Sequence, residues 1–148
     1  MKKFIIYVVF VLVAGPSAYF IYGAVLSSRY DGSIGPYIQE VVPEISKWDP
    51  EIVKQYMAPE AMRTVTAEDL AAIMGTLSKI GSLQSIDKMS FKGKSEVDDA
   101  QFVKHPLITY DVDAQYSTGD AKITIRIIDR EGSYELYHFN FQSKALGL

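Results

Sequence analysis

The stretch Leu107–Ile128, LITYDVDAQYSTGDAKITIRII, constrains the fold more than any other part of this chain. Apolar and polar side chains alternate on both sides of a Ser-Thr-Gly sequence, which is typical of two strands joined by a tight turn. Thr118-Gly119 is predicted to form the turn, because glycine accommodates the positive φ that two-residue hairpins require. The stretch is therefore predicted to be a β-hairpin.

The predicted turn also fixes how the two strands pair. Counting outward from it places apolar residues opposite apolar residues on one face, and polar opposite polar on the other. On the polar face, Asp111 is expected directly opposite Arg126. A slip of one residue would exchange the two faces, so the pattern specifies which side chains point inward. The residues expected on the inner face are Tyr110, Val112, Ala114, Tyr116, Ala121, Ile123, Ile125 and Ile127.

A further strand is predicted over Tyr134–Ser143, which extends the hairpin into a meander. The large apolar residues of this strand change parity halfway along it, so strict alternation cannot bury all of them. A β-bulge near Tyr137-His138 adds one residue and restores a common face. With that bulge, Glu135 is expected beside Arg126 on the polar face. The residues that change parity are Tyr134, Leu136, Phe139 and Phe141.

Helix signals precede the hairpin. Asp49-Pro50 combines a capping carboxylate with a proline at the first helical position. Thr66 and Asp69 resemble a capping box, with Asp in place of the usual Glu, and Gly81 is placed to stop the helix that follows. The apolar stripe expected to face the core in that helix consists of Leu70, Ile73, Met74, Leu77 and Ile80.

Weaker signals place the remaining segments. A helix is expected to open at Pro36, with a kink or a second start near Pro43, because a proline inside a helix costs about 3 kcal/mol. Pro59-Glu60 opens a further short turn. Leu83–Phe91 alternates loosely and is predicted to be a strand, whereas the polar, charged Lys92–Ala100 is predicted to be a loop or an irregular edge.

The N-terminus predicts a membrane anchor. Lys2 and Lys3 precede an uncharged apolar run over residues 4–26, and about 20 apolar residues are enough to cross a bilayer. The lysines are expected to remain on the cytoplasmic side. We favour an uncleaved anchor over a signal peptide, because cleavage after Ala18 would leave Pro16 at the −3 position. The expected organisation is an anchor or uncleaved signal over 1–26, a linker over 27–35 and an α+β domain over 36–148.

Composition excludes several classes of protein. The chain of 148 residues contains no cysteine, which rules out disulfides, thiolate metal sites, a cysteine nucleophile and a lipidated cysteine. The net charge is −3, and the part that follows Lys2 and Lys3 is more acidic still. Because the chain also has no dense stripe of Lys and Arg, we expect no nucleic-acid partner.

The order of these segments resembles a known superfamily. WDPEIVKQYMAPEAM, a capped helix ending in LSKIGSL, and QYSTGDAKITIRIIDREGSYELYHFNFQS together are similar to the nuclear transport factor 2-like (cystatin-like) superfamily, in particular to small membrane-targeted bacterial members of undefined role. The likeness covers roughly residues 36–143, and Tyr134 stands where a tryptophan is commoner. It implies helices packed on a curved antiparallel sheet of about four strands, often with a cone-shaped cavity, and frequent dimerisation through the sheet.

Candidate site residues are few. Tyr110 and Tyr116 are expected on the inner face, where a tyrosine hydroxyl could line a cavity. An isomerase-like enzyme of this fold would also need a carboxylate base there, but no carboxylate falls on that face. His138 and Asn140 lie at the predicted bulge, and bulges occur near functional sites. His105 and His138 belong to different elements and do not suggest a metal centre, which needs three or four ligands; we expect no metal and no other cofactor.

Two functional hypotheses follow. The first is a non-enzymatic binding or assembly module, tethered to the bacterial inner membrane by one pass through residues 4–26, with its domain in the periplasm or at the cell exterior. Its partner would be a second copy or another protein at the sheet face, or a small apolar ligand. The second is a small cavity enzyme of the ketosteroid isomerase or dehydratase type. Secretion after signal cleavage is the alternative to anchoring.

Overall fold

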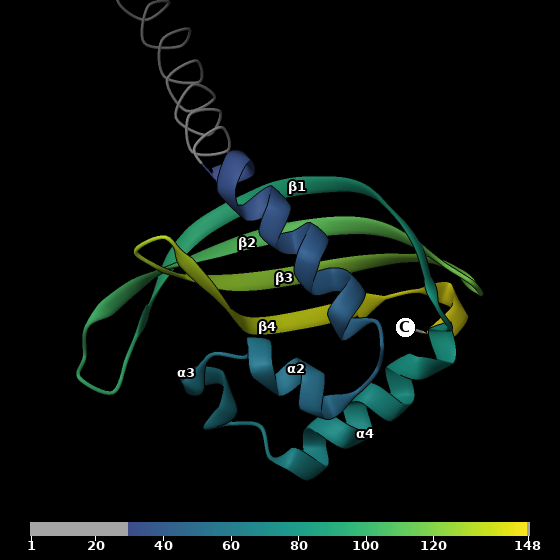
Figure 1. Cartoon of the computed structure of the whole chain (residues 1–148), viewed down its shortest axis with the longest axis horizontal. Coiled ribbons are helices and arrows are strands. Elements are labelled where there is room, and N and C mark those ends of the chain that lie inside the picture. Colours follow the sequence, from purple (N-terminus) through teal and green to yellow (C-terminus); the bar gives the residue numbers. More distant parts are fainter. Residues whose placement is uncertain (1–29, 148) are drawn as a thin grey trace, which may run out of the picture. The chain divides into compact units, whose positions relative to one another are not determined.

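The computed structural model describes residues 30–147, so the expected anchor over 1–26 lies outside the described residues. The chain divides into two compact units, residues 1–35 and 36–148. The second unit combines helices with an open antiparallel sheet in the order β1-β2-β3-β4 (Figure 1). Within residues 30–147, no helix combines the length and apolar character needed to cross a bilayer. The elements are α2 (Pro50–Tyr56), α3 (Pro59–Met62), α4 (Ala67–Leu77), η1 (Ser78–Ile80), β1 (Leu83–Asp98), β2 (Lys104–Tyr116), β3 (Gly119–Arg130), β4 (Ser133–Gln142) and η2 (Lys144–Leu146).

A helix over residues 30–45 precedes these elements. The predicted start at Pro36 is wrong, because residues 30–35, expected to belong to a linker, are already helical. Pro43 lies in the last turn, two residues before the helix ends. Figure 1 shows that the part from Pro36 onward crosses one face of the sheet. Its buried stripe, at 0% exposure, consists of Ile38, Val41, Val42 and Ile45, as the helical spacing predicts.

The capping predictions for the later helices are confirmed. The Asp49 carboxylate accepts a hydrogen bond from the backbone N–H of Glu51, and α2 follows directly. Thr66 and Asp69 form a reciprocal capping box at the start of α4. Gly81 ends η1 with φ 92°, in the region that favours glycine. One inward assignment in α4 is wrong, because Ile73 is 42% exposed.

The β2–β3 hairpin exists, but its turn lies one residue earlier than predicted, which shifts the partner of each β2 residue by two positions along β3. Ser117 and Thr118 form the turn, and Gly119 pairs with Tyr116 as the first residue of β3. Asp111 consequently faces Thr124, and the predicted Asp111–Arg126 pair is wrong. The Thr124 hydroxyl donates to the Asp111 carboxylate at 2.9 Å.

The shift of two residues leaves the assignment of faces intact, because side chains alternate with a period of two. The inner face of the hairpin is buried as predicted, and Asp111 and Asp113 point to the opposite face. The buried inner residues, each at 5% exposure or less, are Tyr110, Val112, Ala114, Tyr116, Ala121, Ile123, Ile125 and Ile127.

The outer strands, β1 and β4, agree with the predictions only in part. β1 contains the predicted Leu83–Phe91 strand and continues to Asp98. Of the two alternatives given for Lys92–Ala100, the irregular edge is confirmed and the loop is wrong, because β1 is an edge strand with a register shift between Phe91 and Gly93. Residues 99–103 connect it to β2. In β4 the predicted bulge is confirmed: Arg126 pairs with His138 and Ile127 with Leu136, which leaves Tyr137 as the extra residue. Glu135 pairs with Ile128, so its predicted place beside Arg126 is wrong.

Candidate functional site

A second, smaller core forms at the end of the sheet where β1 joins β2. Leu107 and Ile128 pair with each other and point away from the main core, yet they are 4% and 0% exposed. They are buried because α3 covers them with Ala58 and Ala61. The chain reaches this face past β4, where the backbone N–H of Ala58 donates to the carbonyl of Leu136 at 2.7 Å. Both faces of the sheet are therefore apolar at this end.

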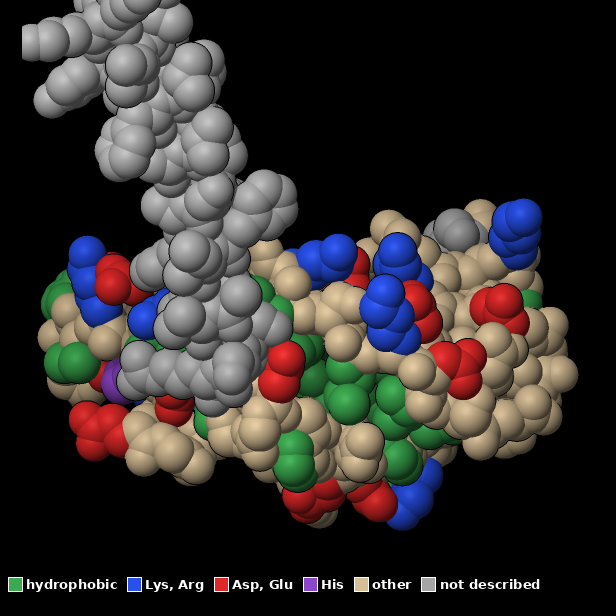
Figure 2. Space-filling view, turned by 90° about the horizontal axis from the view of Figure 1, so that it is seen from above, with side chains coloured by type: hydrophobic (Ala, Val, Ile, Leu, Met, Phe, Trp, Pro, Cys, Tyr) green, Lys and Arg blue, Asp and Glu red, His purple; other side chains and the backbone are tan. Residues whose placement is uncertain are grey.

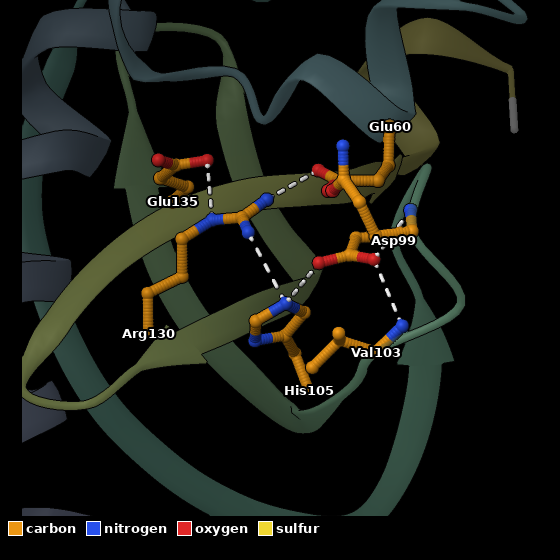
Figure 3. A network of polar contacts seen from close by, with 7 residues as sticks. Glu60, Asp99, Val103, His105, Arg130 and Glu135 are labelled. Atoms are coloured by element: carbon orange, nitrogen blue, oxygen red, sulfur yellow. Dashed lines mark hydrogen bonds and ion pairs between the residues drawn. The ribbon is translucent and has the colours of Figure 1, made fainter.

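A polar cluster lies on the same side as the second core, and we call it the Arg130 cluster: Glu60, Asp99, His105, Arg130 and Glu135. The Arg130 guanidinium donates through Nη2 to the Glu60 carboxylate. Its Nε lies 3.1 Å from Glu135 Oε2, an ion pair whose alignment falls short of a hydrogen bond. Figure 3 shows Arg130 reaching from β3 between these two carboxylates. One cation thus joins α3 to the β3–β4 pair.

The other half of the cluster holds the connection between β1 and β2. His105 Nε2 lies 2.9 Å from Asp99 Oδ2, and the same nitrogen lies 3.5 Å from Arg130 Nη1 (Figure 3). Nε2 must carry the proton in order to donate to Asp99, so the Arg130 contact is electrostatic proximity rather than a second hydrogen bond. His105 therefore lies between the two halves of the cluster.

Asp99 also organises the loop itself, and we call residues 99–103 the apex loop. The other carboxylate oxygen of Asp99, Oδ1, accepts from the backbone N–H groups of Gln101 and Val103, both at 2.9 Å. The backbone N–H of Asp99 donates to the carbonyl of Val103, and that of Phe102 donates to the carbonyl of Asp99. One aspartate thus closes the loop through both its side chain and its backbone, as in Asx-turns.

The apex loop presents two apolar side chains to solvent. Phe102 is 85% exposed and Val103 is 52% exposed, and Phe102 has φ 61°, in the left-handed region. For a non-glycine residue that conformation costs roughly 1–2 kcal/mol. At the end of the molecule that carries this loop, Figure 2 shows hydrophobic side chains at the surface with charged ones beside them. Phe102 thus carries a backbone cost that no burial offsets.

The charges of the Arg130 cluster shift one another's pKa values. Burial alone would raise the pKa of Glu60, but the hydrogen bond and charge of Arg130 outweigh it, so the pKa is lowered. The hydrogen bond to Glu60 raises the pKa of Arg130. The hydrogen bond from His105, followed by the loop backbone N–H groups, lowers the pKa of Asp99. The neighbours of Glu60 and Asp99 therefore favour the ionised form of these two carboxylates.

The tyrosines predicted as cavity candidates lie in a packed interior. Tyr110 is 1% exposed, with its ring 5.7 Å from that of Phe91. The Tyr116 hydroxyl lies 2.7 Å from Ser46 Oγ, one of the two donating to the other, and its ring packs against Trp48. Burial raises the pKa of Tyr116 to about 12, so the hydroxyl stays protonated near neutral pH. This arrangement matches a core hydrogen bond rather than an acid or base.

The residues predicted at the bulge do not join the Arg130 cluster. His138 and Asn140 are exposed, opposite Arg126 and Thr124 respectively. Desolvation and the Arg126 guanidinium lower the pKa of His138, in that order of size. The structure therefore places the tyrosines and the bulge residues on opposite faces of the sheet.

The Arg130 cluster was missed at the sequence level because its members come from separate parts of the chain. One signal for it does exist in the hairpin. Leu107-Ile108 and Ile127-Ile128 are consecutive apolar pairs that break the alternation at the open end of the hairpin. Such pairs indicate burial on both faces, and a covered outer face needs polar groups at its margin. Within residues 30–147, no set of three or more His, Asp or Glu is arranged to hold a metal ion.

Another hollow lies at the opposite end of the hairpin. It is an open depression of about 890 Å³ beside the β2–β3 turn. Asp113, Asp120, Lys122 and Lys144 are among its charged lining residues. It is wide and open to solvent rather than enclosed, and charges of both signs line it, so it lacks the convergent apolar walls of a small-molecule site.

Comparisons with protein-family models, with curated proteins and with solved structures found no match for this chain.

Proposed function

We propose that this protein is a non-enzymatic binding or assembly module, tethered to a membrane by residues 4–26 and exposed to the periplasm or cell exterior. The observation that carries this proposal is the apex loop: its ordered backbone holds Phe102 and Val103 in solvent. The Arg130 cluster supports the loop through His105, and the charged side chains of the cluster pair with one another. An exposed apolar element built in this way favours recognition over catalysis.

The proposed tether comes from the sequence. Lys2 and Lys3 followed by the apolar run over 4–26 favour a single pass with the domain outside the cytoplasm. The nuclear transport factor 2-like assignment likewise remains part of the proposal, supported by the α+β class and the four-stranded antiparallel sheet. No observation on residues 30–147 favours the isomerase alternative, since Asp111 and Asp113 point away from the face that holds Tyr110 and Tyr116.

Two measurements on the full-length chain test this proposal. In the first, cell fractionation is followed by intact-mass measurement of the chain. The expected result is a membrane-bound chain that retains residues 1–26. A soluble chain that begins near residues 19–29 would contradict the tether.

The second measurement addresses assembly. The chain is extracted in mild detergent from the membranes of the cells that naturally produce it, and its particle mass is measured by light scattering with correction for detergent. A module that binds a macromolecular partner is expected to give a particle larger than one copy of the chain. A particle that contains only one copy at every extraction condition would argue against an assembly role.

A further inference from the structure

Strand β1 leaves one edge of the sheet open within residues 30–147. The sheet order is β1-β2-β3-β4, so β1 and β4 are its two edges (Figure 1). The β4 edge is partly covered, because Met57 forms a bridge with Leu136 and the Ala58 N–H donates to the Leu136 carbonyl. In the described part of the chain, no strand or bridge covers the outer edge of β1 in this way. Such an edge presents backbone N–H and C=O groups to which a further strand can bond.

The two halves of β1 differ in how readily they could accept a further strand. Three register shifts interrupt the pairing of the first half with β2, the last of them between Phe91 and Gly93. Irregularities of this kind protect an edge against further pairing. From Gly93 to Asp98 the register is unbroken, and the side chains of residues 94–96 are exposed. The second half of β1 is therefore the part of the edge that is regular enough to be extended.

The charges on this half are arranged in a self-complementary order. In the sequence KGKSEVD, two lysines precede Ser95 and two acidic residues follow it at the same distances. If two copies of the strand pair antiparallel around a two-fold axis at Ser95, Lys94 of each copy lies opposite Glu96 of the other. Lys94 and Glu96 point to the same face of the strand, because side chains alternate along an unbroken register. Each copy would thus supply both halves of a cross-strand ion pair.

Other ways of pairing two copies of β1 are disfavoured. Residues opposite each other in one sheet must point to the same face, so the axis passes through a residue and not between two. An axis at Lys94 or at Glu96 places that residue opposite its own copy, and an axis at Val97 places Glu96 opposite Asp98. Like charges directly opposite are destabilising. An axis nearer the start of the strand would need pairing through the register shifts, so Ser95 is the favoured centre.

We propose that β1 pairs with β1 of a second copy of this chain, antiparallel over residues 93–97 with a two-fold axis at Ser95, so that two four-stranded sheets become one continuous sheet. This inference names the partner in the proposed assembly role and rests on that role. Within one chain, Lys104 already lies 3.7 Å from Glu96. Pairing adds Lys94 of the second copy on the other side of Glu96, which gives a row of alternating charges.

The interface is small, as in weak and transient complexes. Attachment of both copies to one membrane, through the proposed tether, raises their effective concentration and favours the pair.

A disulfide at the two-fold axis tests the pairing. Because the chain contains no cysteine, Ser95→Cys introduces its only thiol. The two Cα atoms at position 95 are expected about 4.5–5.5 Å apart, a distance that a disulfide can span. The full-length variant is oxidised mildly in membranes of the cells that naturally produce it, and the expected product is a disulfide-linked dimer. Ser85→Cys is the matched control, exposed on the same strand, and is expected to give roughly tenfold less dimer because its copies lie out of reach.

Two further variants test the register. Lys94→Cys and Glu96→Cys, produced together with different mass tags, are expected to form a mixed disulfide. Each produced alone is expected to form little, because its own copy lies two positions along the partner strand, about 8 Å away.

Charge reversal tests the ion pairs themselves. In the Ser95→Cys chain, Lys94→Glu or Glu96→Lys is expected to slow dimer formation by roughly fivefold or more, since each places like charges opposite at two symmetric positions. Combining Lys94→Glu with Glu96→Lys restores opposite charges and is expected to return the rate to within about twofold. Added salt is expected to slow dimer formation in the chain that keeps Lys94 and Glu96, because exposed charges are screened. Thermal melting checks that each variant is folded.

Several outcomes would overturn the pairing of β1. Ser95→Cys may not link faster than Ser85→Cys, may link to a different protein, or may be insensitive to charge reversal; a double reversal without rescue counts in the same way. If the wild-type particle extracted from membranes holds more than one copy and Ser95→Cys gives no dimer, the pairing fails while the assembly role stands. If that particle holds one copy at every extraction condition and no dimer forms, the assembly role fails as well.

Discussion

Two buried tyrosine hydroxyls illustrate how much a single polar atom matters in this fold. The Tyr116 hydroxyl lies 2.7 Å from Ser46 Oγ, whereas the buried Tyr37 hydroxyl has no hydrogen-bond partner within residues 30–147. Burial raises the pKa of both hydroxyls, so both stay neutral. A net hydrogen bond is worth about 1 kcal/mol, and an unsatisfied buried hydroxyl is a cost.

The same substitution should therefore have different effects at the two sites. Tyr116→Phe is expected to lower the free energy of unfolding by about 1 kcal/mol, because it also leaves Ser46 unpaired. Tyr37→Phe is expected to leave it unchanged or to raise it slightly. Urea denaturation of both variants provides the comparison. A larger loss for Tyr37→Phe than for Tyr116→Phe would contradict this assignment of the hydroxyls.

Gly81 is a second residue whose environment predicts a large effect. Its φ is 92°, and a Cβ there would lie 1.8 Å from Ser117 Oγ. Its carbonyl also accepts from the Trp48 indole N–H at 2.8 Å. Gly81→Ala is expected to cost more than about 2 kcal/mol, from the backbone conformation and the clash together. Gly75→Ala is the matched control: nothing lies within 4 Å, and alanine in a helix should add about 0.5–1 kcal/mol. Denaturation midpoints distinguish the two, and equal shifts would refute the packing around Gly81.

At the scale of elements, the register of the hairpin can be tested by coupling. Asp111 accepts a hydrogen bond from Thr124 and does not face Arg126. A double-mutant cycle with Asp111→Ala and Thr124→Val is expected to give a coupling energy of about 0.5–1 kcal/mol. The cycle with Asp111→Ala and Arg126→Ala is expected to be additive. Coupling found only in the second cycle would restore the register that places the turn at Thr118-Gly119.

The hairpin also shows what a sequence can and cannot specify. Alternation identified both faces, because parity is unchanged by a shift of two residues. The turn itself is chosen by tertiary contacts: the Ser117 N–H donates to the Ser82 carbonyl, and Thr118 Oγ1 donates to the Ile80 carbonyl. Local preference favoured Gly119, and docking of the turn against the end of η1 outweighed it. Such contacts depend on residues more than thirty positions away, which no local pattern reports.

The extension of β1 beyond Phe91 and the Arg130 cluster could not be predicted from the sequence for a related reason. The second half of β1 is mostly exposed, so its polar residues show no alternation even though β2 pairs with it throughout. The cluster depends on α3 covering the outer face of the sheet, which the short Pro59-Glu60 signal does not reveal. The helix caps and the bulge at Tyr137 were predictable, because each is specified by residues close together in the chain.

Removal of Arg130 should affect both the second core and the apex loop. Arg130→Met leaves Glu60 and Glu135 without their shared cation, and breaking a partly buried ion pair is expected to cost about 2–3 kcal/mol. Amide hydrogen exchange is expected to quicken in residues 99–105 more than in α4. Lys47→Met is the control, since it breaks an exposed pair with Glu44 that is worth under about 1 kcal/mol. Equal effects of the two substitutions would show that the cluster contributes no more than a surface ion pair.

At the scale of the whole molecule, the lowered carboxylate pKa values set how the fold responds to acid. Glu60 and Asp99 have pKa values below their ordinary 4.5 and 3.8, so the unfolded chain binds their protons more readily than the folded one. Their contribution to stability is complete above those ordinary values and is lost as the pH falls through the lowered ones. The pKa of His138 is also lowered, which adds a small loss of stability below about pH 6.5.

The melting temperature is therefore expected to fall slightly between pH 7 and pH 5 and steeply below about pH 4.5. His138→Gln should remove the first decline and leave the second. Arg130→Met should start from a lower melting temperature and show a shallower acid decline, because the pKa of Glu60 is no longer lowered by the guanidinium. Differential scanning calorimetry across this pH range provides the measurement. A wild-type acid decline identical in slope to that of Arg130→Met would mean that the cluster does not couple protonation to folding, and the apex loop would then lack the electrostatic support assigned to it.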